Sequence, residues 1–290
     1  MTFEGQFDVY KTKIEERLSA LIRFERPETL CAAMRYSALG GGKRLRGALL
    51  LAACEACGGS VDNALDFAVA LEMIHAYSLV HDDLPAMDDD DFRRGQPSCH
   101  KVYGEAVAIL AGDGLLNLAY ETMVNACLRH DSGGALHAMA AIAHSAGAQG
   151  MVGGQVLDMA ATHKTIDNDT LLTIYNKKTG ALFMAALTAG GLLADCRPEM
   201  MRFLTEVSAR IGLAFQIKDD ILEQTVTGAE LGKSTNSDAK NAKSTYVTVN
   251  GLAKAQADYA KLYAETKDLL AQWGNPFMAA LTDRLFERKM

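Results

Sequence analysis

The chain has 290 residues, of which 49% are apolar, and a formal net charge of −7. This acidic balance argues against nucleic acid or another polyanion as a partner. Residues 1–13 mix charged and isolated apolar side chains, unlike a signal peptide. The longest apolar run, residues 181–194, is shorter than the roughly 20 residues of a membrane span. We therefore expect a cytoplasmic protein without a membrane span.

The composition predicts long helices and one domain. The chain contains five prolines, and alanine and leucine are abundant, so helix breakers are few. No linker, charge block or internal repeat divides the sequence, and helical domains reach this length. We expect an all-α, single-domain helical bundle whose site lies in a central cavity lined by facing helices.

Helical periodicity recurs along the chain. In the first strong segment, Asp62 is a candidate N-cap, and one helix face continues at steps of three or four through Leu65, Val69, Glu72, His75 and Leu79 to Asp82. Pro85 limits this helix at its C-terminal end. Residues 169–193 form a second helical segment with Gly180 in its middle. Glycine there costs about 1 kcal/mol relative to alanine, which indicates close packing or a functional constraint.

The C-terminal part continues the helical pattern. Residues 199–222 form a third long segment that ends near the acid pair Asp219-Asp220. Residues 244–249 are a short β-branched run, which we expect to be a helix start or a loop.

Cys54 and Cys57 have C-x-x-C spacing, but no second pair follows, so we expect reduced, buried thiols on a helix.

The first candidate site is a run of six aspartates within ten residues: Asp82, Asp83, Asp88, Asp89, Asp90 and Asp91. A solvated acidic loop is one interpretation. However, the run follows an apolar helix directly, and Arg93-Arg94 come next. Clustered carboxylates need positive charge among them, and hard oxygen ligands suit Mg²⁺ with substrate phosphates. Adjacent arginines bind phosphate oxygens. Together these residues indicate diphosphate chemistry.

A second acid group lies at the end of another apolar helix. Asp219 and Glu223 are four residues apart, and Gln216 lies three residues before Asp219, so all three share one face. Basic residues form separate groups that include Lys43, Arg44 and Arg46 after three glycines, Lys178 beside Thr179, Lys233, and Lys243 as a further candidate. Residue 227 is threonine where a nucleotide P-loop requires glycine, so ATP hydrolysis is not supported.

The segments GGKRLR (41–46), HAYSLVHDDLPAMDDDDFRRG (75–95), KTGAL (178–182), GLAFQIKDDIL (212–222) and LGK (231–233) resemble the trans-prenyl diphosphate synthases, most of all the bacterial farnesyl diphosphate synthases. The resemblance spans nearly the whole chain in the family's motif order. It implies a polyprenyl synthetase domain over residues 1–290, a fold of the isoprenoid synthase type, and a homodimer.

The resemblance also implies roles for individual residues. Mg²⁺, in three ions and with Mn²⁺ as the alternative, would be held on an allylic diphosphate by Asp82, Asp83, Asp88 and Asp219. The same diphosphate would contact Arg93, Lys178 and Lys233. The pocket for isopentenyl diphosphate would be formed by Gly42, Lys43, Arg46, His75 and Arg94. Thr179 and Gln216 would lie near the developing allylic cation.

In such enzymes the allylic C–O bond ionises, the double bond of isopentenyl diphosphate attacks the cation, and a proton is lost. Three positions depart from the family's pattern. Glu223 stands where a third aspartate is usual, which keeps the oxygen donor and adds a methylene. Gly47 and Val247 stand where prolines are common, which changes backbone stiffness.

Product length depends on the helix below Asp82. Ser78 lies one turn below it, about 6 Å away, and Ile74 two turns, about 12 Å. Tyr77 is bulky and lies about 140° from Asp82 around the axis. Small Ser78 leaves room beyond one isoprene unit and Tyr77 would close the floor, so farnesyl diphosphate is the expected product. Geranylgeranyl or geranyl diphosphate is the alternative.

Other functions explain fewer of the motifs. A terpene cyclase would not need Lys43 and Arg46 for a second diphosphate. A non-catalytic helical subunit should have lost one acid cluster, and both are present. A calcium-binding or structural bundle leaves Lys178-Thr179 and Arg93-Arg94 without a role.

Overall fold

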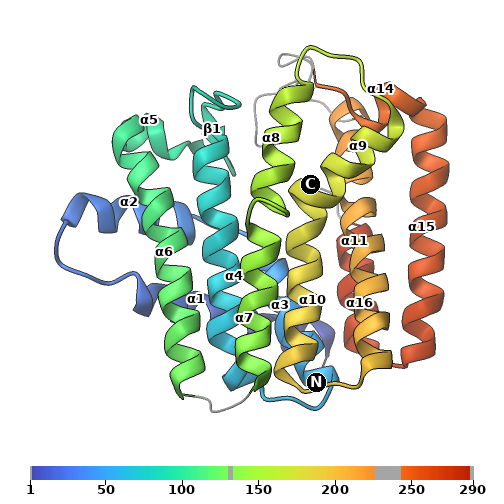
Figure 1. Cartoon of the computed structure of the whole chain (residues 1–290), viewed down its shortest axis with the longest axis horizontal. Coiled ribbons are helices and arrows are strands. Elements are labelled where there is room, and N and C mark those ends of the chain that lie inside the picture. The colour runs from blue at the N-terminus through green and yellow to red at the C-terminus, as the bar shows by residue number, and fades with distance from the viewer. Residues whose placement is uncertain (1, 130–132, 226–242, 288–290) are drawn as a thin grey trace.

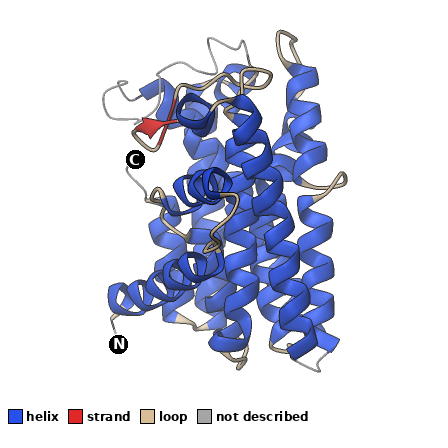
Figure 2. Ribbon diagram, turned by 90° about the vertical axis from the view of Figure 1, so that its left-hand side faces the viewer, coloured by secondary structure: helices blue, strands red, loops and turns tan. Residues whose placement is uncertain are grey.

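A computed structural model describes residues 2–129, 133–225 and 243–287. Within these ranges the chain forms helices and one two-stranded hairpin (Figures 1 and 2). The helices of the first half are α1 (Phe3–Leu21), α2 (Glu28–Leu39), α3 (Leu45–Ala56), α4 (Val61–Asp82), α5 (Cys99–Tyr103), α6 (Glu105–Arg129) and α7 (Gly133–Ala146). Those of the second half are α8 (Met151–Ala161), α9 (Asn168–Tyr175), the π-helix η1 (Asn176–Gly180), α10 (Ala181–Leu193), α11 (Pro198–Thr225), α14 (Tyr246–Asn250), α15 (Leu252–Trp273) and α16 (Pro276–Phe286). The predicted all-α bundle is confirmed.

Helix α4 is the centre of the bundle and carries the first acid cluster at its end. It packs against α3, α6 and α10 and is buried around most of its circumference, which explains its nearly uniform apolar sequence. The predicted cap was wrong: Ser60 accepts the Asn63 N–H at 3.4 Å, whereas Asp62 lies in the first turn and pairs with Lys13 at 2.8 Å. The helix ends at Asp82, before Pro85.

Helix α6 runs beside α4 (Figure 1). Of the helices that the structure describes, α6 is long and apolar enough, by length and composition alone, to cross a membrane. In its most apolar 18-residue stretch, 39% is buried inside the protein. Small residues such as Ala108, Ala111 and Ala119 form its buried face. The composition of that face is therefore accounted for by packing inside the bundle.

The predicted segment 169–193 is continuous helix with a π-turn in its middle. The π-turn η1 contains Lys178, Thr179 and Gly180, and such turns occur frequently at functional sites. A Cβ added to Gly212 of α11 would lie 2.8 Å from the Gly180 Cα. The close approach of the two helices thus requires glycine at position 212, whereas a Cβ added to Gly180 would make only ordinary contacts, 3.4 Å or more from its nearest neighbours.

Two short elements complete the frame of the site. The β-branched run 244–249 starts a helix: Thr245 caps α14 through a capping box with Thr248. The hairpin of β1 (Phe92–Arg93) and β2 (Gln96–Pro97) was not predicted. Its two-residue strands are too short to show an alternating pattern, but its turn has positive φ at both Arg94 and Gly95, as a tight hairpin requires.

Helix α8 packs directly on the π-turn at a glycine. A Cβ added to Gly154 would lie 2.2 Å from the Lys178 backbone nitrogen, and this backbone atom has little room to move. Gly154→Ala should therefore lower the free energy of unfolding by about 1–3 kcal/mol, measured by urea denaturation. Gly133→Ala is the matched control, because no described atom lies within 4 Å of its added Cβ. Equal stability of the two variants would contradict this packing.

Candidate active site

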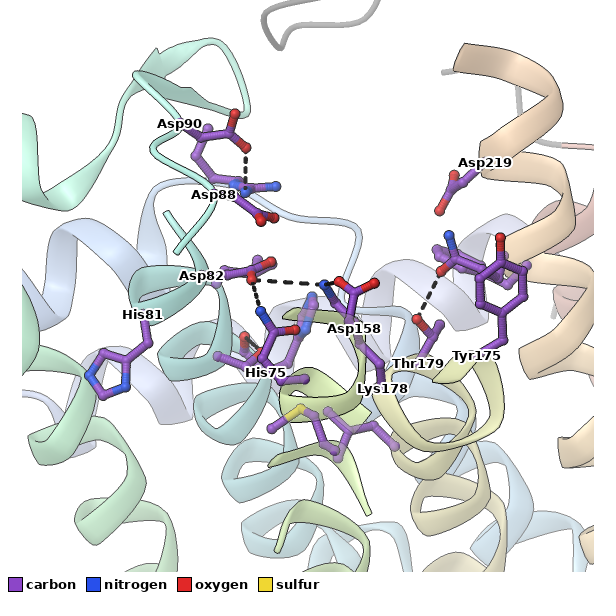
Figure 3. Close-up of a pocket in the computed structure, with 18 of the residues that line it drawn as sticks. His75, His81, Asp82, Asp88, Asp90, Asp158, Tyr175, Lys178, Thr179 and Asp219 are labelled. Carbon is purple, nitrogen blue, oxygen red and sulfur yellow. Dashed lines mark hydrogen bonds and ion pairs between the residues drawn. The ribbon is translucent and has the colours of Figure 1, made fainter. Parts of the chain in front are cut away.

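A cavity of about 1130 Å³ opens between α3, α4, α8, η1 and α11. Its walls carry residues from every motif that the sequence analysis identified within the described ranges. Asp82 and Asp88 lie on one side, and Asp219 projects from α11 on the facing side (Figure 3). The two acid groups therefore converge on one cavity, as predicted.

The aspartates of the first cluster point in different directions. Asp82 lines the cavity and accepts a hydrogen bond from the Gln155 amide. Asp88 also lines it and accepts from Lys243 Nζ at 2.6 Å. Asp83 is 2% exposed, lies outside the residues that line this cavity, and forms a two-oxygen ion pair with Arg93. Two of the three predicted metal ligands thus face the cavity, and the third holds an arginine that lines it.

Arg93 joins the first acid cluster to the cavity wall. Besides Asp83, its guanidinium contacts Asp90 Oδ2 at 3.1 Å. Burial alone would lower the pKa of Arg93, but the ion pair with Asp83 and the charges of Asp82 and Asp90 together raise that pKa. The guanidinium is therefore a permanent positive charge, fixed in place by two carboxylates, at the position predicted to meet an allylic diphosphate.

The two aspartates at the end of α11 also differ. Asp219, Asp220 and Glu223 all line the cavity. Asp220 is 2% exposed and accepts hydrogen bonds from the Tyr175 hydroxyl and, at 2.7 Å, from the Tyr246 N–H. Donors of the protein itself thus hold Asp220, and Asp219 is the member of this pair placed to bind a cation facing the cavity.

Thr179 and Gln216 meet across η1 and α11. The Thr179 hydroxyl donates to Gln216 Oε1 at 2.9 Å, and Gln216 Nε2 donates to Asp220 Oδ1 at 3.2 Å. Asp220 therefore sets which way the glutamine amide points. The Gln216 carbonyl oxygen faces Thr179 and the cavity. This oxygen is the negative end of the amide dipole, the end that stabilises a positive charge.

The basic loop before α3 forms the other end of the cavity. Arg46 Nη1 lies 3.3 Å from His75 Nε2, and the guanidinium stacks on the Phe183 ring at 4.6 Å. Burial, followed by the charge of Arg46, lowers the pKa of His75 well below its ordinary value, so the imidazole is neutral and accepts from Arg46. Lys43 lines the same end.

Gly42 allows Arg94 to join this group. Its φ is +132°, and an added Cβ would lie 2.9 Å from Arg94 Nη1. The same guanidinium donates to the Gly41 carbonyl. Lys43, Arg46, His75 and Arg94 are thus brought together as predicted, whereas Lys233 lies outside the described residues.

Comparisons with known proteins agree with this arrangement. The family model described as polyprenyl synthetase matches residues 27–271. This chain belongs to the polyprenyl synthetase family. It is 44% identical to a farnesyl diphosphate synthase of Geobacillus stearothermophilus, over 90% of this chain and 88% of the relative. It is 42% identical to a chloroplastic geranylgeranyl pyrophosphate synthase of Capsicum annuum, over 91% of this chain and 73% of the relative.

Solved structures also share the fold. A geranyltransferase from Helicobacter pylori, complexed with magnesium and isoprenyl diphosphate, superposes with a TM-score of 0.85 at 29% identity and covers 98% of each chain. The fold is therefore that of the isoprenoid synthases, and the chain is a prenyltransferase of the trans-prenyl synthase type.

Helix α8 contributes two cavity residues that sequence reasoning missed. Gln155 bonds Asp82, and Asp158 accepts from Lys178 Nζ at 2.7 Å. A signal was present: these polar residues stand three apart, on one face, in the otherwise apolar segment MVGGQVLDMAA. Lys243, a further candidate from the sequence, lies 3.4 Å from Asp158.

The departure at position 47 has a structural counterpart. The Gly47 N–H donates to buried Glu72 Oε1 at 2.8 Å, a bond that proline has no N–H to make. Glu72 Oε2 in turn lies 3.9 Å from Arg44 Nη1. Glycine at this position therefore anchors the carboxylate that faces the basic loop.

The described side chains fit a divalent cation that is shared with substrate phosphates. No group of three potential ligands clusters among the residues described. The carboxylates of Asp82, Asp88 and Asp219 instead face the cavity from two walls. Mg²⁺ is typically held by one or two carboxylates together with phosphate oxygens, so this donor set suits it.

Proposed function

We propose that this prenyltransferase is Mg²⁺-dependent and makes (2E,6E)-farnesyl diphosphate. It would join isopentenyl diphosphate first to dimethylallyl diphosphate and then to geranyl diphosphate. The observation that carries this proposal is the single cavity in which two acid groups face each other and two separate sets of cationic residues lie. A cyclase, with one diphosphate to bind, would need one such set.

Each cationic set has a defined role in this proposal. Arg93 and Lys178, with Lys233, bind the allylic diphosphate and stabilise the charge that grows on it as the C–O bond breaks. Mg²⁺, held by Asp82, Asp88 and Asp219, would add Lewis-acid stabilisation of the same leaving group, while Asp83 holds Arg93 in place. Manganese is the alternative ion. Lys43, Arg46, His75 and Arg94, beside Gly42, bind isopentenyl diphosphate.

The remaining residues guide the cation. The Gln216 carbonyl oxygen and the Thr179 hydroxyl oxygen present negative dipole ends where the allylic cation forms. The double bond of isopentenyl diphosphate, held close, attacks that cation, and the released diphosphate accepts the proton that is lost. The side chains thus act through charge and position, and the reaction requires no protein nucleophile.

Product analysis tests this proposal. The protein should be incubated with isopentenyl diphosphate, Mg²⁺ and either dimethylallyl or geranyl diphosphate, and the products separated by chromatography. We expect farnesyl diphosphate from both starters and no turnover with excess chelator. The curated relatives include both farnesyl and geranylgeranyl synthases. A mainly C20 product would therefore indicate a geranylgeranyl diphosphate synthase. Products without incorporated isopentenyl units would overturn the proposal.

We also propose that the protein is a cytoplasmic homodimer that pairs through α6. Leu110, Val124 and Leu128 are 57%, 41% and 80% exposed and share one face of this helix. Leu136 of α7 is exposed as well. Such an apolar surface is typical of a subunit interface. Light scattering should show a dimer, and the Leu110→Glu, Leu128→Glu double variant should be monomeric. A monomeric wild type at micromolar concentration would contradict the interface.

A further inference from the structure

A row of alternating charges crosses the mouth of the cavity. Lys243 Nζ lies 2.6 Å from Asp88 and 3.4 Å from Asp158, and Lys178 Nζ lies 2.7 Å from Asp158 and 3.9 Å from Asp82. Figure 3 shows Asp158 beside Lys178, between the two walls. Within the part of the chain that the structure describes, Asp158 is the carboxylate that pairs with both lysines, at 2.7 Å and 3.4 Å.

The positive and negative charges of this row lie next to one another, because each ammonium group lies between two carboxylates. Two ammonium groups this close repel each other unless an anion lies between them. Asp158 is that anion.

The outer members of the row have a second task in the proposed function. Asp82 and Asp88 are proposed metal ligands, yet each also pairs with a lysine. A carboxylate oxygen that binds a divalent cation is less available to an ammonium group. Each lysine must then rely on Asp158 and on the incoming diphosphate. Without Asp158, both lysines would compete more strongly with the cation for Asp82 and Asp88.

We propose that Asp158 is a positioning residue, which holds Lys178 and Lys243 on the α8 side of the cavity and so leaves Asp82 and Asp88 accessible to a divalent cation. This inference rests on the proposed function and adds Asp158 to it. Asp158 contacts neither substrate in this assignment and acts through the two lysines.

Asp158→Asn is the direct test, because it removes the charge and keeps the shape. Titration calorimetry with Mg²⁺ and inorganic diphosphate should show the Mg²⁺ concentration for half-saturation rising about tenfold, the effect of losing one charged contact. The KM for geranyl diphosphate should rise by a similar factor, while the KM for isopentenyl diphosphate changes less than about twofold. Glu199→Gln is the control: it loses one charge on the surface end of α11 and should leave these values unchanged.

A double-mutant cycle shows whether Asp158 acts through a lysine. If it does, Asp158→Asn combined with Lys243→Met should lose less diphosphate affinity than the product of the single losses. Asp158→Glu, which retains the charge, should recover most of the Mg²⁺ affinity and serves if the asparagine variant does not fold. Multiplicative losses, or unchanged Mg²⁺ and diphosphate binding in Asp158→Asn, would overturn the proposal.

Two further results distinguish a failure of the Asp158 proposal from a failure of the proposed function. A uniform rise in both KM values with a lowered melting temperature in Asp158→Asn would also overturn it, because that pattern shows a merely structural role. A wild-type protein that binds Mg²⁺ and inorganic diphosphate as described, but does not elongate allylic substrates, would count against the proposed function. The binding experiments would still decide the role of Asp158.

Discussion

Asp82→Ala is expected to lower turnover by about a thousandfold or more, because it removes a carboxylate that faces the reacting diphosphate. The substitution shortens a side chain at the cavity wall, where Gln155 is its main hydrogen-bonding partner. The fold should therefore persist. Steady-state rates with geranyl and isopentenyl diphosphates measure the loss, and far-ultraviolet circular dichroism should match the wild type.

Asp83→Ala provides the informative comparison. We expect turnover to fall by about a hundredfold or more, with the helical circular dichroism intact. Asp83 pairs with Arg93, so its loss should mainly weaken binding of the allylic diphosphate. If Asp83 instead ligates the metal, the Mg²⁺ concentration for half-maximal rate should rise as in Asp82→Ala. Near-wild-type turnover in both variants would remove the first acid cluster from the mechanism.

Ser78→Phe should change the main product from farnesyl to geranyl diphosphate. Ser78 lines the cavity one turn below Asp82, and its hydroxyl donates to the His75 carbonyl at 2.9 Å. A benzyl group there would fill the space that the second isoprene unit needs. Chromatography of the dephosphorylated products gives the chain length directly. A variant that still makes mainly farnesyl diphosphate would contradict the proposed path of the growing chain.

Tyr77→Ala is the reciprocal variant and should lengthen the product toward C20. The Tyr77 ring is 6% exposed, lines the cavity, and meets the His81 ring edge-to-face at 5.7 Å. Burial raises the pKa of its hydroxyl to about 12, so the group is neutral and acts through its bulk. An unchanged product would show that another residue closes the cavity.

Several features could be predicted because they depend on local sequence. Helical periodicity and the scarcity of prolines led to the long helices, and Pro85 marked the end of α4. The spacing of Gln216 and Asp219 placed both on one helix face, and both line the cavity. The unfavourable Gly180 marked the position of the π-helix that carries Lys178 and Thr179. Motif order then led to the family.

The amino-acid sequence by itself determined the helices, the residue types that gather in the site and the charge each one brings. The tertiary structure decided which neighbours face the cavity. Adjacent residues on a helix point about 100° apart, so the members of a pair meet different partners. Asp83 lies outside the cavity lining and pairs with Arg93, whereas Asp220 lines the cavity and accepts hydrogen bonds from the Tyr175 hydroxyl and the Tyr246 N–H. The same packing places Asp158 between Lys178 and Lys243, although Asp158 is distant in the chain from both acid clusters. No local sequence pattern could predict that these three side chains meet.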